Sequence, residues 1–229
     1  MRKLVLFDID GTLVLTGGAG LRAMNLACAD IAGHADALAD IPVAGRTDRI
    51  ILTDIVGRLG HELDEDLLAE LRGRYLEHLR EEIGRPGRGV KAVMPGVREL
   101  LDALDARADA FVGLLTGNFE EGARIKLGHF DLWRYFRCGA FGDDAADRNA
   151  LVPFALERAR QQGLPDLSAE HILVVGDTPH DVACARAVGA LPVGVATGGF
   201  TVDQLRQSGA DTVFEDLSDT RAFLALLAD

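Results

Sequence analysis

Two aspartates separated by one residue follow the first apolar run of the chain. Residues 3–7 lead directly into Asp8, Asp10 and Gly11. Paired carboxylates at a strand end can divide the work of a displacement at phosphorus, because one attacks while the other protonates the leaving group and later activates water. A turn made by the Asp-Gly dipeptide, with Asp10 capping a helix, explains the same residues. Alone, the pattern leaves both interpretations open.

Thr116, Gly117 and Asn118 follow a second apolar run at residues 110–115. A hydroxyl group and successive backbone amides at the start of a helix suit the binding of phosphate oxygens. A helix cap without any ligand is the alternative, since Thr and Asn are common at that position. This segment therefore predicts either a phosphate-binding loop or an ordinary cap.

A third apolar run, residues 172–175, ends in Gly176, Asp177 and, four residues later, Asp181. Carboxylates in this arrangement can hold a hard divalent cation together with Asp8. A helix cap plus a surface charge is the simpler alternative.

The apolar runs alternate with stretches of helical character. This order predicts a doubly wound parallel sheet with helices on both faces, built from residues 3–7, 110–115, 172–175, 191–195 and 212–214. Ligands of such sheets bind beyond the carboxyl ends of the strands, which is where the polar residues lie.

The segment after the first strand has a different pattern. Apolar residues recur at helical spacing within 66–83, and similar stretches occupy 21–31 and 49–59. We therefore expect residues 16–91 to form an inserted helical domain, and residues 1–15 and 92–229 to form the α/β core. The glycine-rich residues 16–20 are a candidate hinge between the two.

Taken together, these motifs resemble those of the haloacid dehalogenase superfamily. Residues 8–12 match its first motif, Thr116 its second, and Gly176 and Asp177 with Asp181 its fourth. The resemblance covers essentially the whole chain, because the phosphoglycolate phosphatase and β-phosphoglucomutase group also places a helical cap after the first motif. It implies a Rossmann-like core with a cap and an enzyme that acts on small phosphorylated metabolites.

The third family motif supplies a lysine, and this chain departs from it. Its three lysines, Lys3, Lys91 and Lys126, all lie outside the expected position. Residues 147–154 resemble the usual segment, with Arg148 where the lysine would fall. We assign Arg148 the role of the lysine, because a guanidinium can neutralise a phosphoryl oxygen and the Asp8 carboxylate. The alternative is a surface arginine.

The resemblance implies a role for each motif. Asp8 attacks the phosphate to form an aspartyl-phosphate, and Asp10 serves as acid and base. Mg²⁺ is held by Asp8, the backbone carbonyl of Asp10 and Asp177, while Asp181 orients these groups. Phosphoryl oxygens and the rest of the substrate are expected to contact the following residues: Thr116, Gly11, Thr12, Gly117 and Asn118.

The cap contributes weaker candidates. Arg46 and Thr47 resemble the cap loop that faces the active site in relatives, so they are candidates for binding the nonreacting end of the substrate. A cap at the start of a helix explains the same segment. His180 lies inside the fourth motif but is interpreted as a loop residue, because Asp10 already supplies the acid and base.

Other activities within the family are less consistent with the residues. A dehalogenase lacks the second aspartate, whereas Asp10 is present. A phosphonate hydrolase needs a lysine from the cap, and no lysine lies between Lys3 and Lys91. A phosphomutase shares every core motif and remains the main alternative. A noncatalytic phosphate-binding protein is expected to have lost some carboxylates.

Composition limits the partners. The net charge of −12 would repel a nucleic-acid backbone, while a local cation or metal still permits binding of a small anion. No segment approaches the roughly 20 apolar residues of a membrane span, and the apolar run at the N-terminus is too short for a secretory signal. We expect a cytoplasmic protein that is a monomer or weak homodimer, without nucleic-acid or membrane partners.

Overall fold

The computed structural model describes residues 2–228, and its centre is a six-stranded sheet. All strands are parallel, in the order β5-β4-β1-β6-β7-β8. The strands span β1 Lys3–Phe7, β4 Ala110–Leu115, β5 Cys138–Ala140, β6 Ile172–Gly176, β7 Leu191–Val195 and β8 Thr212–Phe214. The predicted doubly wound parallel sheet is confirmed, including all five predicted strands.

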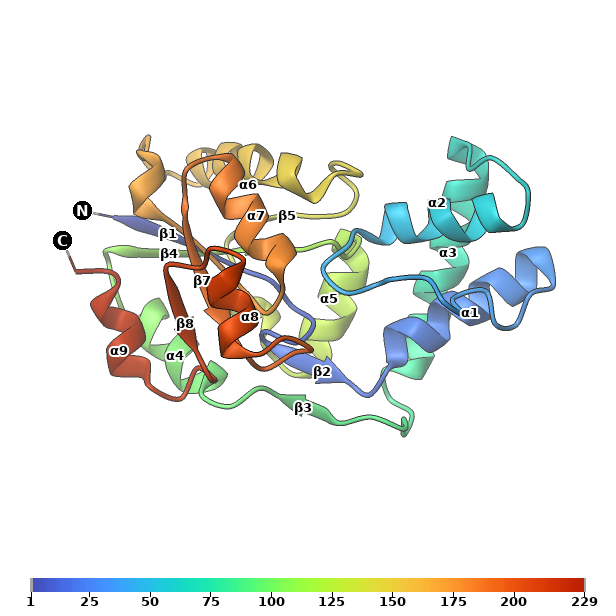
Figure 1. Ribbon diagram of the computed structural model, residues 1–229, viewed down its shortest axis with the longest axis horizontal. Helices are drawn as coiled ribbons and strands as arrows, with labels where there is room; N and C mark the ends of the chain where they lie inside the picture. The colour runs from blue at the N-terminus through green and yellow to red at the C-terminus, as the bar shows by residue number, and fades with distance from the viewer. Residues whose placement is uncertain (1, 229) are drawn as a thin grey trace.

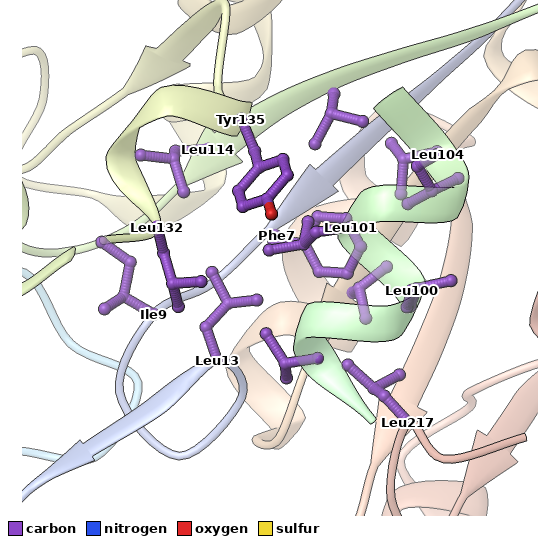
Figure 2. Packing of buried hydrophobic residues seen from close by; sticks show 14 of the residues in the cluster. Phe7, Ile9, Leu13, Leu100, Leu101, Leu104, Leu114, Leu132, Tyr135 and Leu217 are labelled. Carbon is purple, nitrogen blue, oxygen red and sulfur yellow. The ribbon is translucent and has the colours of Figure 1, made fainter. Parts of the chain in front are cut away.

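Strand β1 is buried on both faces of the sheet. Val5 and Phe7 point into one apolar cluster, and Leu4 and Leu6 point into the other. This alternation follows from the two-residue period of a strand, and burial on both faces explains why β1 is a continuous apolar run. Figure 2 shows Phe7 beside Leu101 in the first cluster.

Helices cover the two faces of the sheet (Figure 1). The cluster around Phe7 is completed by α4 Val97–Asp105, α5 Glu120–His129 and α9 Thr220–Ala225. The opposite cluster is completed by α6 Leu151–Gln161 and α7 Pro179–Ala187. Helix α8 Val202–Gln207 packs on β7 and β8.

Three helices lie to one side of the sheet domain, at the right of Figure 1. They are α1 Ala19–Ala32, α2 Asp48–Arg58 and α3 Glu65–Glu82, and they share a separate apolar cluster with Phe119. Two strands, β2 Val14–Thr16 and β3 Lys91–Val93, pair antiparallel where the chain leaves and re-enters the core. We refer to the three helices with their connecting loops as the cap.

Three strands have no counterpart in the sequence-based expectation: β2, β3 and β5. Each spans three residues, which is too few to show an alternating pattern, although the equally short β8 was predicted. Among the helices of residues 2–228, none combines the length and apolar character needed to cross a bilayer.

Candidate active site

The motif residues meet because their strands are neighbours. Strands β4, β1 and β6 are adjacent and parallel, so the residues that follow them lie at one edge of the sheet. Asp8, Thr116 and Asp177 all line one cavity of about 560 Å³ between core and cap. Residues distant in sequence are thereby brought to one site.

Three carboxylates cluster at this site, and two of them, Asp8 and Asp177, line the cavity. Asp8, Asp177 and Asp181 are buried, and each offers an oxygen within 4.8 Å of the others. Burial raises the pKa of Asp177 to about 8, and the charges of Asp8 and Asp181 add to the effect. Burial also raises the pKa of Asp8 to about 6, although Arg148 opposes the shift. The cluster has an excess of negative charge that a divalent cation would relieve, so its donor set fits Mg²⁺.

Backbone atoms close tightly around Asp177. Gly11 has a φ of +85°, and a Cβ atom there would lie 2.5 Å from the Asp177 carboxylate. A Cβ atom on Gly198 would lie only 1.8 Å from it. Thr12 is fully buried and donates a hydrogen bond of 3.0 Å to Oδ1 of Asp177. Gly11 and Thr12 thus fix the position of this carboxylate.

Arg148 is buried beside the acidic cluster. Its Nη2 lies 3.0 Å from Oδ1 of Asp8 and 2.5 Å from Oδ1 of Asp181. The guanidinium also donates to the carbonyl oxygens of Gly45 and Leu115. The arginine placed by sequence spacing is therefore not a surface residue, since only 6% of it is exposed.

Asp181 already has hydrogen-bond donors on both carboxylate oxygens. Oδ2 accepts from the backbone amide and hydroxyl of Thr178 in a capping box at the start of α7, and Oδ1 accepts from Arg148. These contacts leave Asp8 and Asp177 as the more open carboxylates, and they suit Asp181 to orienting Arg148.

Asp10 lies apart from the acidic cluster. Its Oδ2 accepts hydrogen bonds from Nζ of Lys126 at 2.6 Å and from Nδ2 of Asn118 at 2.8 Å. Asn118 also binds Lys126 through Oδ1 and Thr116 through Nδ2. With 44% of its side chain exposed, Asp10 faces the cavity while two neighbours hold it.

Lys126 has no role in the sequence-based expectation, although its Nζ lies 2.6 Å from Asp10. It lies on α5 and is 5% exposed. Lysine is rare in this chain, which has only three. That rarity is the sequence signal that could have drawn attention to Lys126. Its contact with Asp10 joins residues 116 positions apart in the sequence, which no local pattern specifies.

The loop after β4 is tied to the cap. The carbonyl oxygen of Gly117 accepts from the amide of Asp48 at 2.7 Å, and the Asp48 carboxylate accepts from the amide of Phe119 at 2.9 Å. A Cβ atom on Gly117 would lie 2.1 Å from the carbonyl oxygen of Arg46, so the two loops require a glycine here. Gly117 and Asn118 both line the cavity.

The cap candidates differ in their surroundings. Arg46 lines the cavity, but its guanidinium pairs with Asp54 at 2.7 Å and donates to the Pro42 carbonyl. Thr47 is buried and caps α2 by accepting from the amide of Ile50, as in the capping interpretation of this segment. His180 lies exposed in the first turn of α7, so its interpretation as a loop residue was wrong.

Comparison with known proteins shows the family of the chain. Residues 2–189 match the family model of the haloacid dehalogenase-like hydrolases. A phosphoglycolate phosphatase of Rhodospirillum rubrum is 31% identical over 223 residues, which cover 95% of this chain and 89% of the relative. The chain therefore belongs to the haloacid dehalogenase-like hydrolase family. It is an enzyme of the phosphatase class, a phosphoric monoester hydrolase.

Solved structures share the fold. A predicted phosphoglycolate phosphatase from Haemophilus somnus superposes with a TM-score of 0.71 at 23% identity, covering 97% of this chain and 98% of that one. A β-phosphoglucomutase-like protein from Thermotoga maritima superposes with a TM-score of 0.61 at 22% identity, covering 98% and 99%. At these identities the likeness concerns the fold alone.

Proposed function

We propose that this phosphatase is Mg²⁺-dependent and hydrolyses a small phosphorylated metabolite of the phosphoglycolate type through an aspartyl-phosphate on Asp8. The observation that carries the proposal is the position of Asp8, which shares one buried cluster with Asp177 and has Arg148 3.0 Å from its Oδ1. A nucleophilic carboxylate needs such surroundings, because two anions must approach each other during attack.

Asp8, Asp177 and the backbone carbonyl of Asp10 are the groups that would hold the metal, with Asp181 at the edge of the set. When bound, Mg²⁺ supplies positive charge that reduces repulsion between the carboxylate and the phosphate and stabilises the charge that develops during transfer. The raised pKa of Asp177, caused by burial and neighbouring carboxylates, agrees with a site built for a cation.

In the first step, an Asp8 oxygen forms a bond to phosphorus as the bond to the leaving-group oxygen breaks. Asp10 donates its proton to that leaving oxygen. In the second step, Asp10 takes a proton from water, the water oxygen bonds to phosphorus, and the bond to Asp8 breaks. Arg148 balances charge at Asp8, while the hydroxyl of Thr116, the amide of Gly117 and the loop around Asn118 would hold phosphoryl oxygens.

A phosphomutase of the β-phosphoglucomutase type is the second candidate, since it would use the same core residues. The curated phosphatase relative, at 31% identity over nearly the whole chain, favours hydrolysis. Retention of all four motif aspartates argues against a noncatalytic binding protein.

A screen of phosphorylated metabolites with Mg²⁺, scored by phosphate release, tests the proposal. We expect release from a small phosphomonoester and its loss with a chelator. Interconversion of sugar phosphates without net phosphate release would favour the mutase instead.

A further inference from the structure

A second cavity, of about 430 Å³, lies against β5, the edge strand of the sheet. Its lining comes from α5, the 3₁₀ turn Trp133–Tyr135 with the residues that follow it, β5 and α6. These lining residues all differ from those of the cavity between core and cap. The transfer steps proposed above use none of them, so the second cavity has no part in that chemistry.

The second cavity is rich in arginine. Three arginines line it, namely Arg124, Arg137 and Arg158. Among the described residues of the lining, the single carboxylate belongs to Glu120, which is exposed. This excess of positive charge runs against the net charge of −12 of the whole chain. Like charges around one cavity repel each other, and an anion between them relieves the repulsion.

Aromatic rings hold two of these guanidinium groups in place. The guanidinium of Arg124 lies over the Trp133 ring, 4.7 Å from its centre. That of Arg137 lies over the Phe111 ring, 5.6 Å from its centre. Stacking of this kind engages the face of a guanidinium and leaves the N–H donors at its edge free. Both arginines are therefore positioned to donate hydrogen bonds to a ligand.

The charge of Arg158 is already balanced. Each of its Nη atoms lies 2.6 Å from an oxygen of Asp144, and Nη1 also donates to the carbonyl oxygen of Gly139. A bidentate pair of this kind satisfies most of the donors of a guanidinium. Arg158 thus forms a wall of the cavity, and the free positive charge comes from the other two arginines.

Arg124 and Arg137 have only loose ion pairs. The carboxylate of Glu121 lies 3.8 Å from Arg124, and that of Asp105 lies 3.6 Å from Arg137. Both distances exceed that of a hydrogen bond. The two side chains are 54% and 52% exposed, so an incoming anion can reach them.

We propose that this cavity is a second ligand site, which binds a phosphate group carried by inorganic phosphate or by a phosphate ester. A phosphate group has a charge of roughly −1.5 to −2 at pH 7 and offers several acceptor oxygens. Two guanidinium groups match it in charge, and each can bind two of its oxygens. The amides of Gln161 and Gln162 add neutral hydrogen-bonding groups to the lining. The proposal is independent of the proposed function, because the two cavities share no residue.

Trp133 makes the second cavity directly observable, because it lines the cavity and is the single tryptophan of the chain. The parent protein is titrated with inorganic phosphate and with AMP while the tryptophan emission is recorded. Ionic strength is held constant to keep screening equal, and EDTA removes any Mg²⁺ from the active site. We expect a saturable change in emission, half complete at about 1 mM or below, with at least one probe. No saturable change with either probe would overturn the proposal.

The probes also separate the two sources of the phosphate group. Tighter binding of inorganic phosphate would indicate the free ion, and tighter binding of AMP would indicate an ester. Adenosine is the control, since it supplies the rest of AMP without the phosphate. Adenosine that binds as tightly as AMP would show that the phosphate is not recognised, which contradicts the proposal.

Two variants locate the binding. Arg137→Gln removes one cation and leaves Arg124 over Trp133, so emission still reports binding, which should weaken at least fivefold. In Arg124→Gln/Arg137→Gln, calorimetry replaces emission, and binding should weaken at least tenfold. Arg160→Gln is the matched control, at an exposed arginine of α6 that pairs with Asp166, and it should bind like the parent. Thermal unfolding checks that each variant is folded. Parent-like affinity in both cavity variants would refute the assignment.

Discussion

The guanidinium of Arg148 lies 3.0 Å from Oδ1 of Asp8, and both side chains are buried. Because the same nitrogen also contacts Asp181, one cation holds two carboxylates that come from different strand ends. The pair thus links the expected nucleophile to the loop of the fourth motif. We propose that Arg148 takes the place of the lysine in the third family motif.

Arg148→Ala tests this link. We expect a loss of about 2 to 4 kcal/mol of transition-state stabilisation, the range typical of a charged donor at a developing charge. Steady-state kcat/KM for phosphate release measures it, with thermal unfolding to separate inactivity from misfolding. Stability should also fall, because Asp8 and Asp181 would be left buried without their cation.

Arg148→Lys should retain measurable activity, since it keeps the charge while losing the contacts to Gly45 and Leu115. Arg160→Ala, at an exposed arginine paired with Asp166, is the control and should behave like the parent. Parent-like turnover by Arg148→Ala would remove Arg148 from the chemistry.

Asp177→Asn should weaken Mg²⁺ binding. An amide oxygen is a poorer ligand for a hard cation than a carboxylate, so activity should recover partly at high Mg²⁺ concentration. The Mg²⁺ concentration that gives half-maximal phosphate release measures the effect. Chelation should abolish turnover in the parent. An identical metal requirement in variant and parent would exclude Asp177 as a ligand.

Lys126→Met should lower kcat, because the Asp10 carboxylate would lose the ammonium 2.6 Å away that holds it. The fall should be at least tenfold, as expected for an impaired general acid and base. The measurement is kcat for the turnover of 2-hydroxyethyl phosphate, a phosphomonoester without a carboxylate. Arg160→Met, at an exposed cation on α6, serves as the control. If kcat is unaffected in Lys126→Met, Lys126 does not position Asp10.

The buried carboxyl group of Asp48 should make the free energy of unfolding of the protein depend on pH. Burial raises its pKa to about 6, while Lys126 opposes the shift. Its contribution to stability is therefore intact below pH 4 and lost as pH rises through about 6. Asp48→Asn mimics the neutral form, so it should exceed the parent by about 1 to 3 kcal/mol in free energy of unfolding at pH 8 and match it near pH 4.

Urea unfolding at both pH values measures this difference. The exposed Asp36→Asn provides the matched control, for which the difference from the parent should not change with pH. A parent more stable than Asp48→Asn at pH 8 would show that the ion pairing outweighs the burial.

The strands and the motif aspartates were predictable from local sequence. Strands β1, β4 and β6 are apolar runs followed by a polar residue, and their parallel order brings Asp8 and Asp177 to one edge. Arg148 was found by spacing from Pro153. Each of these predictions depends on a short sequence segment and on the rule that functional residues of a parallel sheet follow the carboxyl ends of its strands.

Other parts of the site depend on packing between distant segments. Lys126 reaches Asp10 only because of how α5 lies over the strand ends. The sequence pattern predicts Tyr75 to be an ordinary core residue of an amphipathic helix. Tyr75 lines the cavity because α3 packs against α1 and α5. Strand β5 is too short for any periodicity to appear.

Trapping the phosphoenzyme tests the central claim most directly. In Asp10→Asn, attack by Asp8 can still occur with a good leaving group such as p-nitrophenolate, but water is no longer activated to release the phosphoryl group. The protein is mixed with p-nitrophenyl phosphate and Mg²⁺, quenched in acid and digested for mass spectrometry. We predict a phosphoryl group on Asp8 of the Asp10→Asn protein. The double variant Asp8→Asn/Asp10→Asn should carry no phosphoryl group. Turnover without any phosphorylated peptide, or a phosphoryl group on another residue, would contradict the account.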